Sequence, residues 1–95
     1  MDHKLCNRLI DDMFMEIETA EEYKSLMCHY RDHDDMEKCR LFKDMALEEI
    51  KHFEALHNII GAMLTEEEKT DPGCFKILHD RYAEKYKCMK EELNK

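Results

Sequence analysis

Residues that break helices are almost absent from this chain, and their scarcity limits the folds that it can adopt. The 95-residue sequence holds two glycines and one proline, and none of them precedes Gly61. Glycine and proline disfavour helix most strongly, so the preceding part of the chain can form uninterrupted helices. Apolar residues recur at steps of three or four, which is the period of an amphipathic helix. The sequence therefore predicts an all-α protein.

Polar breaks in this pattern divide a single domain, residues 1–95, into three helices. We expect them at about residues 5–30, 36–64 and 73–93. Asp34 or Asp35 can cap the second helix, because a short side-chain oxygen can accept a bond from the free N–H groups at a helix start. The short connection favours an antiparallel hairpin of the first two helices, followed by a C-terminal third helix.

The acidic charge of the chain argues against several classes of partner. The formal net charge is −8, whereas nucleic acids and anionic membranes attract clustered lysine and arginine. No apolar run reaches the roughly 18–20 residues that cross a bilayer, and the first residues lack the apolar segment of a secretory signal. We therefore expect a cytoplasmic protein that binds neither nucleic acid nor membrane.

The cysteines predict neither a disulfide framework nor a thiolate metal site. The sequence has 5 cysteines, an odd number, and no C-x-x-C pair. Reduced thiols packed in or near a core are the simplest interpretation.

The first helix places a carboxylate among its apolar residues. At ~100° per residue, the following residues share one sector of a helical wheel: Leu5, Leu9, Met13, Ala20, Tyr23, Met27 and Tyr30. Glu16 falls at the centre of this sector, with Asp12 and Thr19 nearby. We expect Glu16 to lie on the packed face of the helix.

The second helix repeats this arrangement. One sector contains Phe42, Met45, Ala46, Phe53, Leu56, Ile60 and Met63. Glu49 lies at its centre and His52 inside its edge. A second E-x-x-H, Glu54 to His57, is expected on the surface, because Glu54 points well away from the sector.

A carboxylate inside an apolar stripe needs a partner, because burying an unpaired charge costs several kcal/mol. It can pair with a cation, stay protonated or bind a metal ion. Glu49 and His52 are three residues apart, so they occupy adjacent turns of one face and can converge on one ion. Mixed carboxylate and imidazole ligands suit iron or manganese, and zinc is an alternative. A histidine satisfied by hydrogen bonds within the core is the simpler reading of His52.

These segments resemble the ligand helices of ferritin-like and rubrerythrin-like di-iron carboxylate proteins. Residues 16–23, Glu-Ile-Glu-Thr-Ala-Glu-Glu-Tyr, are similar to a first ligand helix, with a ligand Glu, a small residue about one turn on and a Tyr two turns on. Residues 46–52, Ala-Leu-Glu-Glu-Ile-Lys-His, are similar to the second, with its E-x-x-H. The resemblance spans roughly residues 9–60 and is greatest to short subunits of the encapsulated-ferritin type.

The resemblance implies a site shared between two chains. A ferritin-like four-helix bundle carries a Glu on each of two helices and a Glu-x-x-His on each of the others. This chain holds one of each, so a homodimer or higher homo-oligomer would complete the bundle and its di-iron centre. The implied ligands and catalytic residues are Glu16, Glu49 and His52. Tyr23 is either a second-shell hydrogen-bond partner or a core aromatic, and Asp12 an entry-site ligand or a solvated carboxylate.

Three functions follow as expectations. The first is ferroxidase or iron-handling activity with O₂ or peroxide as oxidant. The second is a rubrerythrin-like peroxidase, and the third is a non-catalytic helical interaction module that keeps the fold. An encapsulating shell protein is a further partner that the resemblance implies, although residues 90–95 contain no apolar tail that would dock into it.

Overall fold

The computed structural model of the chain describes residues 3–64 and 75–94, and this part of the chain is helical with no strand. The helices are α1 (His3–Asp32), α2 (Met36–Met63) and α4 (Phe75–Leu93). The all-α prediction is confirmed, and both ends of α2 lie within one residue of the expected bounds. Helix α1 extends two residues further at each end than expected, and the predicted start of the third helix at residue 73 lies outside the described residues.

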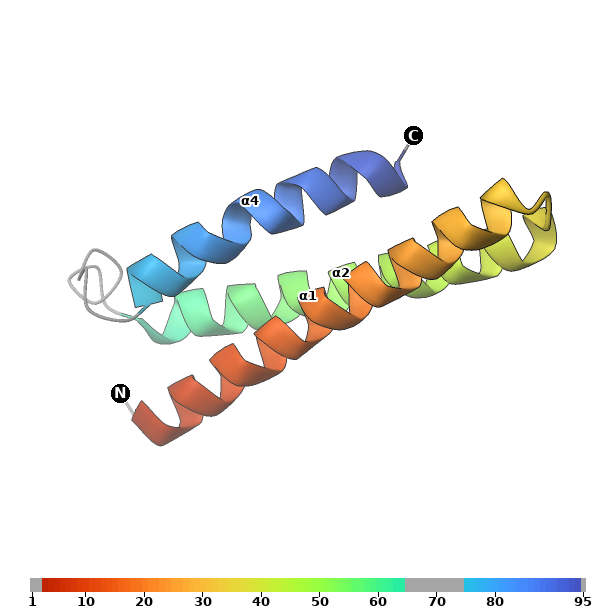
Figure 1. Cartoon of the computed structure of the whole chain (residues 1–95). Helices are drawn as coiled ribbons and strands as arrows, with labels where there is room; N and C mark the ends of the chain where they lie inside the picture. The colour runs from red at the N-terminus through yellow and green to blue at the C-terminus, as the bar shows by residue number, and fades with distance from the viewer. Residues whose placement is uncertain (1–2, 65–74, 95) are drawn as a thin grey trace.

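Helices α1 and α2 form the predicted antiparallel hairpin, and aspartates shape its turn (Figure 1). Asp34 adopts a left-handed backbone conformation with φ 58°, which aspartate tolerates better than most residues. Asp35 is the N-cap of α2, where its Oδ1 accepts a bond of 3.2 Å from the backbone N–H of Lys38. Of the two capping candidates, Asp35 is therefore the one that caps.

The hydrophobic core lies along the contact between the helices. Its buried members include Ile10, Met13, Ile17, Ala20 and Met27 on α1, Ala46, Ile50, Phe53 and Ile60 on α2, and Met89 and Leu93 on α4. Near the turn, the rings of Tyr30 and Phe42 stack at a centroid distance of 5.6 Å. Among the described residues, no polar or charged side chain is fully buried.

Helix α4 returns along the hairpin and contacts both of its helices (Figure 1). Ring stacking fixes it on each side, with Tyr82 on Phe14 at 3.9 Å and Tyr86 on Phe53 at 4.9 Å. Ion pairs join its margins to the hairpin: Lys85 to Glu21 at 3.0 Å, Lys90 to Glu54 at 3.5 Å, and Glu92 to Lys24. The molecule is a slab of 50 × 20 × 15 Å, and α4 covers only one side of the hairpin.

Two further predictions concern membrane-spanning helices and the state of the cysteines. No described helix is both long enough and apolar enough to span a membrane. Cys28, Cys39 and Cys88 are free thiols, as expected, but only Cys39 is buried; Cys28 is partly buried, and Cys88 is exposed instead of packed in the core.

Candidate metal centre

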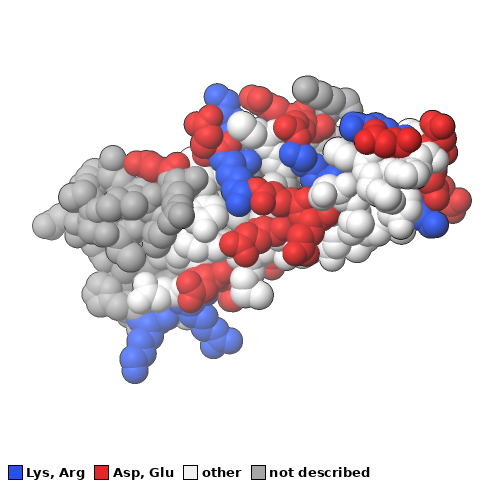
Figure 2. Space-filling model, in the orientation of Figure 1, with Lys and Arg blue, Asp and Glu red and all other residues white. Residues whose placement is uncertain are grey.

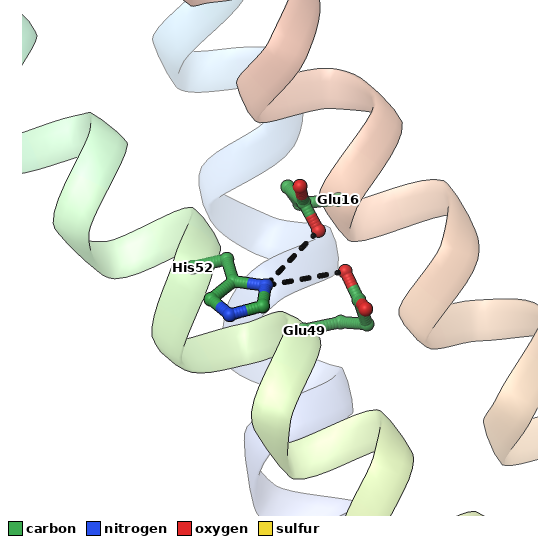
Figure 3. Close-up of side chains that lie close together, drawn as sticks. All are labelled: Glu16, Glu49 and His52. Atoms are coloured by element: carbon green, nitrogen blue, oxygen red, sulfur yellow. Dashed lines mark ion pairs between the residues drawn. The ribbon is translucent and has the colours of Figure 1, made fainter.

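The three predicted ligands meet between the two helices of the hairpin. Glu16 projects from the middle of α1, and Glu49 and His52 project from adjacent turns of α2 (Figure 3). The Nδ1 atom of His52 lies 3.5 Å from Glu16 Oε2 and 3.6 Å from Glu49 Oε2. One potential ligand atom from each residue lies within 4.8 Å of those of the other two. In the described part of the chain, this is the only group of three such residues.

The exposure of these residues differs from the expectation. The wheel put both glutamates at the centre of buried stripes, but 28% of the Glu16 side chain and 20% of the Glu49 side chain are exposed. His52 is more open, with 53% of its side chain exposed. The prediction of a buried position is therefore wrong for the single chain.

The glutamates are partly exposed because each predicted apolar stripe included residues from both the packed face and the exposed face of its helix. On α1, the packed face is centred on Met13, Ile17 and Ala20, which leaves Glu16 at its edge and Leu5 at 45% exposure. The packed face of α2 is likewise turned toward Ile50 and away from His52. The ligands thus lie where the packed face of each helix meets its exposed face.

Two glutamates lie close together in this group. Within residues 3–64 and 75–94, neither Glu16 nor Glu49 forms an ion pair with a lysine or arginine, and their common partner is His52. Two nearby carboxylates repel one another when both are ionised. A bound cation would relieve that repulsion, and a neutral imidazole would add a nitrogen ligand.

The distances suit a metal ion. Ligand atoms held at ~2.1 Å from one ion are separated by roughly 3–4.2 Å, depending on the angle between them. The contacts of 3.5 and 3.6 Å fall in that range. The upper limit of 4.8 Å within the group exceeds it slightly, so a small side-chain rotation, or a second ion, would close the gap. Two carboxylate oxygens and one imidazole nitrogen fit iron, manganese or zinc.

The group borders a shallow depression on the side of the hairpin away from α4. Asp12, Met15, Glu16, His52, Ala55 and Leu56 line this depression of about 380 Å³, and none of them belongs to α4. Asp12 is exposed and stands at its margin, outside the group of three. Its position agrees with a solvated carboxylate, and an entry-site role stays a prediction.

Tyr23 packs within the hairpin. Its ring lies 6.2 Å from that of Phe42. In the described structure, its hydroxyl makes no hydrogen bond to Glu16, Glu49 or His52. The observed contact is that of a core aromatic, and a hydrogen bond from the Tyr23 hydroxyl to a ligand carboxylate remains a prediction for the metal-bound state.

The second E-x-x-H lies partly at the surface, with 41% of the Glu54 side chain exposed, and it also lines a cavity. Glu54 and His57 are both half-buried and line a cavity that α4 covers. A wheel drawn for α2 alone could not reveal this, since the covering side chains belong to another helix. The tyrosines at positions 82 and 86, one turn apart on α4, were the available sign of an aromatic face in need of a partner.

Exposed acidic side chains are numerous on α1. Figure 2 shows Asp and Glu gathered in a band along the middle of the viewed face, and α1 carries exposed Asp11, Glu18 and Glu22. Such a surface raises the local concentration of cations.

Comparisons with protein-family models, curated proteins and solved structures find no match, so the functional argument depends on this geometry.

Proposed function

We propose that this protein is a ferritin-like iron-binding protein that oxidises Fe(II) at a di-iron centre formed between two copies of the chain. One observation carries the proposal. Glu16, Glu49 and His52 bring two carboxylates and an imidazole together from two helices, and no lysine or arginine of the described residues balances the charge.

The half-set of ligands is the reason for proposing a pair. A ferritin-like di-iron centre uses four glutamates and two histidines. Each chain supplies two glutamates and one histidine, so two chains supply 2 × 2 glutamates and 2 × 1 histidines. A two-fold axis through the depression would place the second half-set opposite the first.

The exposed face around the ligands suits a second copy. Leu41, His52 and Ile59 are separated by eleven and seven residues, so they fall on one line along α2. Leu41 is 55% exposed and Ile59 is 49% exposed, which is unusual for large apolar side chains on both flanks of a polar site. Pairing would bury these side chains and shield the ligands from water, giving a four-helix bundle with α4 on its outer side.

In this proposal each ligand has a role. Glu49 and its symmetry mate would hold the ions through their carboxylates, Glu16 would be a further carboxylate ligand, and the His52 imidazole would be the nitrogen ligand. A bound pair of ferrous ions would supply two electrons to O₂ or peroxide. The chain itself positions the ligands on two rigid helices, and its acidic surface draws Fe(II) toward them.

Metal analysis of Glu49→Ala and Glu48→Ala tests the proposal. The two residues are neighbours, but Glu48 is exposed and pairs with Lys51 at 4.0 Å, away from the group. We expect the unaltered chain and Glu48→Ala to bind about one Fe(II) per chain anaerobically, because a shared pair of ions gives one for each half-set. Glu49→Ala should lose this binding. Unchanged iron stoichiometry in Glu49→Ala would refute the centre.

The oxidant is settled by a second measurement. Iron-loaded protein should oxidise Fe(II) in air faster than buffer alone. Faster reaction with hydrogen peroxide than with O₂ would identify the rubrerythrin-like peroxidase instead. No acceleration with either oxidant would leave only the helical interaction module.

A further inference from the structure

A second cavity lies on the opposite side of the hairpin from the candidate metal centre. It has a volume of about 370 Å³, and α1, α2 and α4 all contribute to its wall. Its lining consists of Met13, Phe53, Glu54, His57, Asn58, Tyr82, Ala83 and Tyr86. None of these residues lines the depression beside Glu16 and His52. The volume falls within the range of ligand pockets, roughly 300–1,000 Å³.

Aromatic rings form the walls of this cavity, and their positions are fixed by stacking. Phe53 and Tyr86 stack on one another at 4.9 Å with an interplanar angle of 25°. Tyr82 stacks on Phe14 at 3.9 Å and 20°. Because each wall ring is held by another ring, the cavity presents flat apolar surfaces without first having to rearrange. Flat aromatic walls favour a planar ring over a flexible aliphatic chain.

One corner of the cavity is polar. The ammonium group of Lys90 donates to Glu54 Oε2 at 3.5 Å and to the Tyr86 hydroxyl at 3.3 Å. Burial raises the pKa of the Tyr86 phenol, and the adjacent Glu54 carboxylate raises it further, so this hydroxyl stays protonated at neutral pH. The two oxygens of a carboxylate offer about four acceptor positions, so Glu54 can accept a further hydrogen bond.

The charge of this corner selects against strongly charged ligands. Lys90 already balances Glu54 in this half-exposed corner, so an ionic ligand entering the cavity would find no unpaired charge there to act as its counter-ion. A neutral hydroxyl that donates to the carboxylate needs no counter-ion and forms a bond to a charged acceptor.

We propose that this cavity binds a small neutral phenol, whose ring lies between the aromatic walls and whose hydroxyl donates to Glu54. The site is separate from the candidate metal centre and does not depend on it. The Glu54-x-x-His57 segment thereby belongs to a binding site for an organic molecule, whereas Glu49-x-x-His52 belongs to the metal site.

Three related probes test the chemistry on the unaltered protein by NMR titration of backbone amides. They are 4-methylphenol, toluene, which lacks the hydroxyl, and cyclohexanol, which lacks the planar ring. We expect 4-methylphenol to shift the amides around Phe53, His57 and Tyr86, with an affinity about fivefold or more above that of toluene. Cyclohexanol should bind more weakly still. Equal affinities for 4-methylphenol and toluene, or shifts confined to other residues, would overturn the proposal.

A filled cavity provides the second test. Ala83 lines the cavity, so Ala83→Leu should occupy the space of the probe and abolish the shifts caused by 4-methylphenol. Ala62→Leu introduces the same side chain at an exposed position of α2 outside the cavity and should leave binding unchanged. Circular dichroism of both variants checks that the helices persist. Full binding by a folded Ala83→Leu variant would contradict the assignment.

Discussion

His52 is the common partner of the two carboxylates in the candidate metal centre, because its Nδ1 atom lies 3.5 Å from Glu16 Oε2 and 3.6 Å from Glu49 Oε2. The side chain is more than half exposed, with 53% accessible, so it contributes little to the packing of the core. A residue in such a position can be removed with little cost to the fold. Its role in binding can therefore be separated from any role in stability.

The chain contains its own matched control for this residue. We expect His52→Ala to weaken Fe(II) binding about tenfold or more, since a nitrogen ligand is lost, while the free energy of unfolding of the metal-free protein changes by less than about 0.5 kcal/mol. His57→Ala alters the other E-x-x-H, which lines the cavity between α1, α2 and α4, and should leave iron affinity unchanged. Anaerobic calorimetric titration of both variants measures this. Equal losses in the two would show that neither histidine is a specific ligand.

The raised pKa of Tyr86 predicts that the unaltered chain and Tyr86→Phe differ in stability at alkaline pH. Its pKa is raised in the folded chain, first by burial and then by Glu54. A raised folded-state pKa contributes stability that is fully present below the unfolded value of about 10 and is lost as pH rises through the folded value. The unaltered chain should therefore lose more stability than Tyr86→Phe between about pH 9 and pH 11. Urea unfolding at both pH values compares them, and equal losses would contradict the argument.

At the scale of helices, the turn between α1 and α2 sets how the ligands meet. Asp35 satisfies the N–H of Lys38 at 3.2 Å, and its second carboxylate oxygen pairs with Lys38 Nζ at 3.4 Å. Asp35→Ala should lower the free energy of unfolding by about 1 kcal/mol, the usual value of an N-cap. Asp44→Ala, at an exposed position inside α2, should change it by less than about 0.5 kcal/mol. Chemical denaturation of both variants checks the difference, and a cap variant as stable as the control would be evidence against this role.

The same helices show what could be predicted from the sequence and what could not. The bounds of α2 were predictable because the polar stretch before Met36 and the cap at Asp35 are local signals. The proximity of two of the candidate ligands was predictable too, since Glu49 and His52 share a helix face by spacing alone. The exposure of the group was not, because a wheel describes one helix and contains no information about which neighbour covers each face. For the same reason, the cover that α4 provides over Glu54 could not be read from α2.

The dimensions of the whole molecule argue for a partner. The Cα radius of gyration is 15.3 Å, whereas a compact chain of this length has a value of about 12 Å. The excess arises because the molecule is 50 Å long and α4 lies along only one side of the hairpin (Figure 1). A slab of this kind buries little apolar surface for its size, and small domains in that position are commonly stabilised by association or by a metal.

Metal binding and self-association should therefore be coupled. Ions shared between two half-sets would bind the dimer and not the monomer, so they would shift the equilibrium toward the dimer by mass action. Sedimentation equilibrium with anaerobic Fe(II) should give twice the 11.5 kDa of a single chain, and the dissociation constant should rise when the metal is chelated.

A charged side chain in the proposed interface should abolish both self-association and iron binding. Leu41→Glu places a carboxylate on the line that runs through His52, so it should yield a monomer that also loses iron, because the ligand set stays incomplete. Met36→Glu alters a side chain with the same exposure of 55%, but Met36 borders a different concavity, beside Cys28 and Arg40, and should leave both properties intact. A Leu41→Glu variant that is monomeric yet binds iron as tightly as the unaltered chain would separate the two properties. The centre would then belong to one chain, with Glu16, Glu49 and His52 as its entire set of protein ligands.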